Sequence, residues 1–365
     1  MQHKKQPSIN VFNDTFNHKF FNDINPLNKS LMSPLSVTYA LMMTYLGSNG
    51  ATRMELQKAF NITNETDEEI LKDMTYLLHN INRNSQHIKL FLTNGVYINK
   101  NFNLHKEYQS MVKNLGSIET MDFSNNEKTV KTINDWVANN TNNLIKDLLS
   151  PSSVNPDTVM ILLNTLYFKC SWKKQFKKNL IESAKFTNLL NEESETELMY
   201  MQKHFPYYED DDYQIVEIPY KGEEFTFGIL LPKKSFVLPT NVHNYFDKLK
   251  LSFLDLYFPK FTQRNKMNMK DTFRKMGVKL LFEKEADLSK ISDKNIKVDD
   301  IIHEVVVIVD ETGTEAAAAT AVTFMTECCS VCVDEPILFK ANHTFQYYIK
   351  YVPTNTLLFY GIFDG

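Results

Sequence analysis

Two short apolar segments, 158–163 and 304–309, place the strongest constraint on what this chain can fold into. Both are almost continuously apolar, without the alternation of a half-buried strand, so they predict strands buried on both faces at the centre of a sheet. Further strands are predicted in apolar or alternating segments at 88–94, 214–219, 224–231, 254–258 and in a terminal hairpin of 345–351 and 356–360.

The first 150 residues predict mainly helices. Ser33 can cap a helix that has Pro34 at its first position and a mostly apolar body, and Gly47 and Gly50 are expected to end it. Other helices are predicted at 10–21, 67–79 and 129–149. Because helices come first and strands later, the predicted fold class is α+β. With no linker and no internal repeat, a single domain over 1–365 is expected.

Charge and hydropathy exclude several classes of function. The apolar runs are about five residues long, whereas a membrane-spanning helix needs about 20. Forty Lys and Arg against 44 Asp and Glu give a net charge of −4, and no segment is basic enough to follow a phosphate backbone. We therefore expect neither a membrane-spanning nor a nucleic-acid-binding protein, and no basic helix suggests a glycosaminoglycan cofactor.

The N-terminal segment predicts the location of the protein. Lys4 and Lys5 are not followed by the apolar stretch of a signal peptide, so a cytoplasmic or other intracellular location is expected. Secretion by another route, or from a trimmed precursor, is the alternative. The chain has only four cysteines, too few for a disulfide framework.

Enzymatic motifs are missing from the sequence. There is no Gly-x-Ser-x-Gly and no phosphate-binding glycine loop, and His303-Glu304 is followed by three valines rather than by a second metal-binding histidine. We therefore expect that the protein is not an enzyme and has no cofactor.

The most unusual segment of the chain, 310–326, follows the second central strand. Four alanines, Ala316 to Ala319, are good helix formers, so a short exposed helix is one interpretation. The alternative is a strand held out of the sheet, which a period of two residues tests. Thr314 begins a face on which every residue is small or apolar; the other members of this face are Ala316, Ala318, Thr320, Val322 and Phe324.

If the sheet is more stable with this segment inserted as an extra strand, a loop held out of the sheet stores free energy. Proteolytic cleavage of the loop would release it. Gly313 would supply the swivel for such a rearrangement.

At these residues the chain resembles the serpin superfamily, and the resemblance covers nearly all of the chain. The segment 311–320 is similar to the serpin reactive-loop hinge: Glu311, Gly313, Thr314, Glu315, Ala316, Ala317, Ala318, Ala319 and Thr320. Matches in the same order and spacing lie at 33–36, 164–172, 258–260, 286–289, His303 and 355–361. The resemblance implies three sheets, eight or nine helices and an exposed reactive-centre loop at about 311–338.

The resemblance also implies roles for buried residues. Ser33, Ser36, Asn164 and His303 resemble the hydrogen-bonded shutter beneath the strands that must part for loop insertion. Trp172 resembles the tryptophan of the breach, where insertion begins, and Lys260 is expected to pair there with Glu311.

The function implied by the resemblance is suicide inhibition of a protease. The protease attacks the loop and forms an acyl-enzyme, and the freed loop then inserts as a strand and distorts the trapped protease. The partner is a serine protease or, as an alternative, a cysteine protease. The inhibitor is expected to be a monomer that can polymerise when destabilised. A non-inhibitory serpin that serves as chaperone, carrier or storage protein is the alternative function, which the small hinge residues disfavour.

Family spacing puts the reactive bond between Glu327 and Cys328. A carboxylate there disfavours trypsin-like proteases, because their specificity pocket is acidic, and favours Glu- or Asp-preferring serine proteases or caspase-like enzymes. A slip of register would offer residues 324–326 or Asp334 instead. Such a slip is open because the stretch 327–345 is longer than in most serpins, and because Thr344 stands where the family usually has proline.

Three cysteines gather beside this bond. Cys328, Cys329 and Cys332 lack the second ligand pair of a zinc site, so no metal is expected, and a thiol-sensitive loop or ordinary exposed thiols are the two remaining interpretations.

Overall fold

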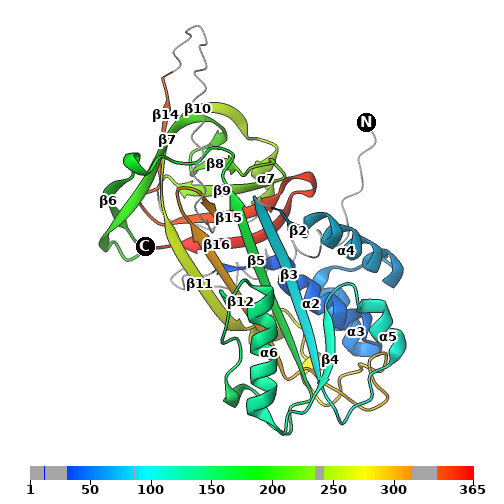
Figure 1. Ribbon diagram of the computed structural model, residues 1–365. Helices are drawn as coiled ribbons and strands as arrows, with labels where there is room; N and C mark the ends of the chain where they lie inside the picture. The colour runs from blue at the N-terminus through cyan, green and yellow to red at the C-terminus, as the bar shows by residue number, and fades with distance from the viewer. Residues whose placement is uncertain (1–11, 13–30, 86, 235–241, 315–334) are drawn as a thin grey trace.

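The computed structural model describes residues 12, 31–85, 87–234, 242–314 and 335–365. These residues form two β-sheets, with most of the helices gathered beside the smaller sheet (Figure 1). The predicted first helix at 10–21 lies outside the described residues except for Phe12, which is buried.

The seven-stranded sheet carries the two strands predicted to be central. Its order is β11, β12, β13, β5, β3 and β2, and β4 pairs with β3 off this path. Both predicted strands have neighbours on each side, which confirms their central position. The bounds are β2 Arg83–Asn84, β3 Ile88–Asn99, β4 Ser117–Met121, β5 Met160–Ser171, β11 Phe261–Asn268, β12 Asp300–Val309 and β13 Gly313–Thr314.

The nine-stranded sheet joins two of the three sheets expected from the family. Strand β7 is 17 residues long and makes the connection. It pairs with β6 and β10 along most of its length, and its last three residues pair with β8, so hydrogen bonding runs without a break from β10 to β8. The bounds are β1 Leu31–Met32, β6 Glu182–Thr187, β7 Glu193–Glu209, β8 Tyr213–Pro219, β9 Phe225–Pro232, β10 Lys250–Pro259, β14 Ile337–Lys340, β15 Phe345–Tyr351 and β16 Thr356–Phe363. Strands β15 and β16 form the predicted hairpin.

Seven α-helices lie within the described ranges, against the eight or nine that the resemblance implies for the whole chain. They are α2 Pro34–Leu46, α3 Gly50–Phe60, α4 Asp67–Ile81, α5 Lys106–Val112, α6 Asn126–Asn140, α7 His243–Phe246 and α8 Lys270–Lys275. Four short 3-10 segments are η1 Pro151–Ser153, η2 Lys178–Leu180, η3 Leu280–Phe282 and η4 Val352–Thr354. None of the described helices is long and apolar enough to span a bilayer.

Two helix predictions were wrong at their ends. Gly50 begins α3 instead of only ending α2, and this helix buries Leu56 and Phe60 on one face. The helix predicted to reach residue 149 stops at Asn140, because Asn142 and Asn143 adopt left-handed backbone conformations that no α-helix continues.

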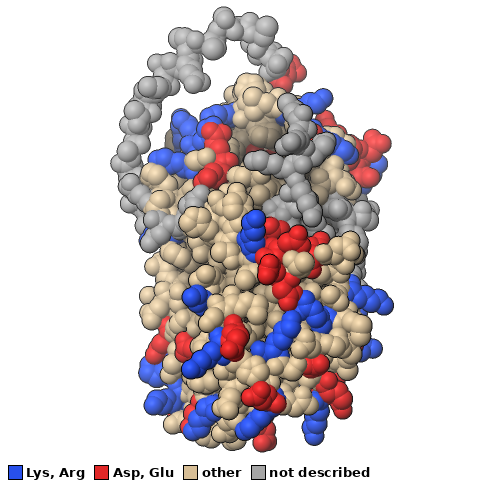
Figure 2. All heavy atoms as spheres, turned by 90° about the vertical axis from the view of Figure 1, so that its right-hand side faces the viewer, with Lys and Arg blue, Asp and Glu red and all other residues tan. Residues whose placement is uncertain are grey.

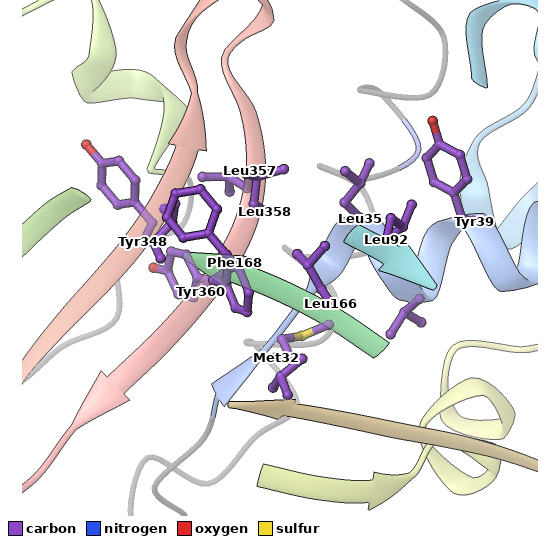
Figure 3. Packing of buried hydrophobic residues seen from close by; sticks show 14 of the residues in the cluster. Met32, Leu35, Tyr39, Leu92, Leu166, Phe168, Tyr348, Leu357, Leu358 and Tyr360 are labelled. Carbon is purple, nitrogen blue, oxygen red and sulfur yellow. The ribbon is translucent and has the colours of Figure 1, made fainter. Parts of the chain in front are cut away.

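The cores lie on the two faces of the seven-stranded sheet. Helix α2 is buried along all of its 13 residues and packs between this sheet and β16, whereas α6 covers the opposite face (Figure 1). On the α2 side, Leu166 of β5 lies among Met32, Leu35 and Leu92, as Figure 3 shows. Apolar side chains of β5 that face α2 therefore pack this helix against the central sheet.

On the face formed by α3, α4 and α5, positive and negative side chains are interspersed (Figure 2). Helix α4 opens with Asp67, Glu68 and Glu69, which suit the positive end of its helix dipole. The visible face has no continuous basic stripe of the kind that binds a polyanion.

Thr344, which stands where the resembling family usually has proline, makes two hydrogen bonds that proline could not make. Its backbone N–H donates to the Thr187 carbonyl over 3.2 Å, and its hydroxyl donates to Oδ1 of Asp364 over 2.5 Å. Asp364 also accepts from the N–H of Leu189 over 2.8 Å, so Thr344 helps to fasten the C-terminal strand to β6.

Truncation of Leu166 tests the importance of the α2 contact. Leu166→Ala is expected to lower the free energy of unfolding by about 2–5 kcal/mol, because it leaves a cavity beneath α2. Urea unfolding followed by circular dichroism measures this change. Leu251→Ala is the control, since Leu251 is 71% exposed and its truncation is expected to cost less than about 0.5 kcal/mol. Equal losses for both variants would contradict the packing argument.

Candidate functional site

The site begins where the two central strands part. Strands β5 and β12 pair in parallel from Ile161–Asp300 to Leu166–Val305. Beyond this stretch, β13 lies between them and runs antiparallel to both, with Thr314 opposite Val309 on one side and opposite Cys170 on the other. The first residues of the predicted hinge are therefore already part of the sheet.

A tight turn at Asp310–Gly313 connects β12 to β13. Oδ1 of Asp310 accepts hydrogen bonds from the N–H of Thr312 over 2.8 Å, from its hydroxyl over 2.7 Å and from the N–H of Gly313 over 3.1 Å. The backbone closes the turn through the Asp310 N–H and the Gly313 carbonyl, 2.9 Å apart. This is an Asx turn, which an Asp with glycine three residues later favours.

Residues 172–176, which follow β5, make hydrogen bonds to the backbone of this turn. Trp172 is only 2% exposed, and its Nε1–H donates to the Asp310 carbonyl over 2.8 Å. Its ring stacks on Tyr220 with centroids 4.5 Å apart and an angle of 6°. The backbone N–H groups of Trp172 and Phe176 donate to the carbonyls of Thr312 and Glu311. The predicted breach tryptophan thus contacts the hinge directly.

Thr314 and Gly313 fit closely into the sheet. Thr314 is 1% exposed and shares a hydrogen bond of 2.5 Å with the hydroxyl of Tyr220, which agrees with the inward face predicted for it. A Cβ on Gly313 would lie 2.1 Å from the carbonyl oxygen of Cys170, so only glycine fits here. The close approach of the backbone to β5 therefore explains why residue 313 is glycine. The role of Gly313 as a swivel during loop insertion stays a prediction.

The predicted ion pair between Lys260 and Glu311 was wrong. Nζ of Lys178 lies 3.2 Å from Oε1 of Glu311, whereas Nζ of Lys260 lies 2.8 Å from Oε2 of Glu197. Pairing of Pro259 with Leu198 brings Glu197 next to Lys260, whose own N–H donates to the Glu197 carbonyl. Sequence reasoning missed Lys178 because it begins the short 3-10 segment η2, which has no recognisable motif.

Both lysines nevertheless act on the Glu311 carboxylate. Partial burial raises its pKa, but hydrogen bonds from its own backbone and from Lys178, with the charges of Lys178 and Lys260, outweigh that effect and lower the pKa below its usual range. The turn therefore presents a charged carboxylate to a basic surrounding.

The four predicted shutter residues lie together and are fully buried. Asn164 of β5 and His303 of β12 are register partners. The Ser33 N–H donates to Nε2 of His303 over 3.1 Å, and the Ser36 hydroxyl donates to Oδ1 of Asn164 over 3.3 Å. Ser33 also caps α2 by accepting from the Ser36 N–H over 3.1 Å. The cluster therefore joins the start of α2 to both central strands.

His303 is held as a neutral ring in one tautomer. Since Nε2 accepts a hydrogen bond, Nδ1 must carry the proton, and it donates to Oδ1 of Asn164. Burial lowers the pKa of His303 to about 3. A protonated ring would set an N–H donor against the Ser33 N–H, so the cluster requires the neutral form.

Comparison with known proteins agrees with this geometry. The family model described as "Serpin (serine protease inhibitor)" matches residues 12–364. The chain belongs to the serpin family. It is 31% identical to an uncharacterized serpin-like protein of Acanthamoeba polyphaga mimivirus, over 97% of this chain and 88% of that one. It is 30% identical to antichymotrypsin-2 of Bombyx mori, over 96% of each chain. The native structure of the thermophilic serpin tengpin superposes with a TM-score of 0.86 at 25% identity, covering 97% of this chain and 94% of tengpin.

As a serpin, the protein is not an enzyme, and the hinge and shutter of this serpin contain no nucleophile and base arranged for catalysis among the described residues. Cys170 is buried beside Gly313, and burial raises the pKa of its thiol to about 12, so it is not a reactive thiol. No group of three potential metal ligands occurs within residues 31–85, 87–234, 242–314 and 335–365.

Several predicted site residues lie outside the described ranges. These are the hinge residues Glu315 to Thr320, the predicted reactive bond of Glu327 and Cys328, and the neighbouring Cys329 and Cys332. The structure adds residues that the sequence did not single out, namely Tyr220, Phe176, Asp310 and Lys178. Of these, only Asp310 had a recognisable signal, its spacing to Gly313.

Charge reversal tests the corrected ion pair of this serpin. Glu311→Lys is expected to loosen the turn and to accelerate the loss of monomer on heating. The acceleration should be only a fewfold, because a partly exposed pair contributes only about 1 kcal/mol. Native gels after a heating series measure the remaining monomer. The double variant Glu311→Lys, Lys178→Glu is expected to restore most of it. If the double variant polymerises as fast as the single one, Lys178 is not the partner.

A pH series tests the neutral His303. In the unfolded chain histidine takes up a proton near pH 6.5, whereas folded His303 does so only near pH 3, so its contribution to stability is present above 6.5 and is lost as the pH falls. The effect is at most about 1.4 kcal/mol per pH unit. His303→Gln is expected to flatten the dependence of the unfolding free energy on pH between 6.5 and 4.5.

Urea titrations at each pH provide this measurement. His79→Gln serves as the control, because His79 is an exposed histidine on α4. An unchanged slope in His303→Gln would show that the ring is not held neutral by its burial.

Proposed function

We propose that this serpin is a suicide inhibitor of proteases. The observation that supports this most directly is the position of Gly313 and Thr314 between β12 and β5, where a strand has started but the two central strands still pair below it. In the proposed mechanism a protease cleaves the loop after Glu327 and becomes acylated, and the loop then continues as a strand from Thr314.

The register of β13 indicates how insertion would proceed. Continued from Thr314 opposite Cys170, an inserted strand would run antiparallel to β5 and β12 and would separate their parallel stretch, including the Asn164–His303 pair. One parallel ladder would be replaced by two antiparallel ladders. Because antiparallel pairing is slightly more stable per residue and the number of ladders doubles, this exchange favours insertion.

The hinge residues suit passage beneath α6. Continuing the alternation from the inward Thr314 would direct Ala317 and Ala319 toward the face that α6 covers. Side chains of this size can enter a packed layer without the overpacking that larger ones would cause. The composition of the hinge therefore agrees with an inserting rather than a fixed loop.

The target of the proposed inhibitor is set by the residue before the reactive bond. With Glu327 there, we propose a Glu- or Asp-preferring serine protease, or a cysteine protease of similar preference. A cleavage site elsewhere in 324–334 would keep the mechanism and change the target class.

A substitution at Thr314 tests the mechanism. Wild type and Thr314→Arg are mixed with a panel of Glu/Asp-preferring, chymotrypsin-like and caspase-like proteases and examined on denaturing gels. Wild type is expected to form an SDS-stable complex and to release a peptide that begins at Cys328. Thr314→Arg is expected to be cleaved with at least about a tenfold loss of complex, because an arginine cannot be buried unpaired beside Tyr220.

Thr63→Arg, at an exposed position between α3 and α4, is the matched control and should trap like wild type. Cleavage of wild type without any complex, and without a rise in thermal stability after the cut, would contradict inhibition and favour a non-inhibitory serpin. A released peptide that begins elsewhere would overturn only the predicted bond.

A further inference from the structure

A small cavity opens on the surface between β7 and β10 on one side and β8 and β9 on the other. Its volume is about 270 Å³, close to the lower end of the roughly 300–1,000 Å³ of small-molecule sites. The segment after Trp172 and the turn after Tyr220 form part of its rim. A cavity of this size suits a small organic ligand rather than a peptide.

The walls of the cavity are mostly apolar. Pro206 and Leu251 face each other in the β7–β10 register, and Ile218, Pro219 and Val352 line the other side. Leu251 is 71% exposed and Val352 is 40% exposed, so two of the seven large apolar side chains that the described chain exposes meet in this one place. Exposed apolar side chains that converge on a concave surface are typical of a binding site.

The floor of the cavity holds a carboxylate whose charge is already compensated. Glu217 is 7% exposed, and its Oε1 accepts from the Tyr348 hydroxyl over 2.6 Å and lies 2.6 Å from Nζ of Lys350. Because the Lys350 ammonium is itself buried, Glu217 and Lys350 form a neutral pair. The floor therefore neither requires a cation from a ligand nor strongly repels an anion.

The rim carries an excess of positive charge. Lys173 is paired with Glu223 over 2.7 Å, but Lys174 and Lys203 make no ion pair with any described residue. Two uncompensated ammonium groups beside an apolar hollow attract an anionic group and leave room for an apolar body below it.

We propose that this cavity binds a small apolar organic anion, a carboxylate or sulfonate on an alkyl or aromatic body. The body would pack against Pro206, Leu251 and Val352, and the anionic group would lie at Lys174 and Lys203. None of the described residues that line this cavity belongs to the predicted reactive loop, so the proposal is independent of protease inhibition.

Titration of the folded full-length chain with 1-anilinonaphthalene-8-sulfonate tests the proposal. Fluorescence is expected to show saturable binding of one molecule per chain. Leu251→Asp is expected to weaken binding at least about tenfold and Lys203→Glu about fivefold, since the first removes the apolar wall and the second reverses a rim charge. Both side chains are exposed, so both variants are expected to fold, which near-ultraviolet circular dichroism checks.

Matched controls separate this site from general dye binding. Leu190→Asp removes another exposed leucine and Lys72→Glu reverses a charge on α4, and both should bind within twofold of wild type. The neutral probe N-phenyl-1-naphthylamine should bind at least about fivefold more weakly than the sulfonate. Absence of saturation, equal losses in the controls, or equally tight binding of the neutral probe would each overturn the proposal.

Discussion

The parallel pairing of β5 with β12 is the interaction on which the rest of this serpin depends. It extends over only six residues of each strand, from Ile161 to Leu166 and from Asp300 to Val305. Within it, hydrogen bonds from Ser33 to His303 and from Ser36 to Asn164 connect the ladder to the start of α2. Above it, the hinge already separates the same two strands. The two central strands are therefore in direct contact over this short ladder and are separated by β13 beyond it.

The interior of the ladder and the end next to the hinge are stabilised by different physical means. At the shutter, Ser33, Ser36, Asn164 and His303 are fully buried and linked by hydrogen bonds, so the loss of any one of these bonds would leave a buried polar group unpaired, which is costly. At the breach, Trp172 and its aromatic neighbours surround a turn fastened mainly by backbone carbonyls. Every residue has a backbone carbonyl, so a hydrogen bond to a carbonyl does not depend on which residue accepts it. Trp172 and Phe176 therefore hold the backbone of the turn, and the side chains of Asp310, Thr312 and Glu311 add their own contacts.

Sequence reasoning succeeded where a local pattern has one physical meaning. The apolar runs identified β5 and β12 as central strands, and Ser33 with Pro34 identified the start of α2, because burial and capping depend on neighbouring residues. It failed where distant segments decide the outcome. Lys178 reaches Glu311 and Tyr220 reaches Thr314 only through the packing of separate elements, and neither has a motif. Helix α3 was missed because glycine is more typical of the end of a helix than of its first residue, and Gly50 begins α3.

The β5–β12 pairing also has a consequence for synthesis on the ribosome. About 130 residues separate the end of β5 from the start of β12, so translation at about 5–20 residues per second delays β12 by roughly 6–26 s. During that interval β3 and β5 can pair, but the other edge of β5 has no native neighbour. An apolar strand with an unpaired edge is a template for association with other chains. The nascent chain therefore passes through a period in which the apolar strand β5 must be shielded before its native neighbour exists.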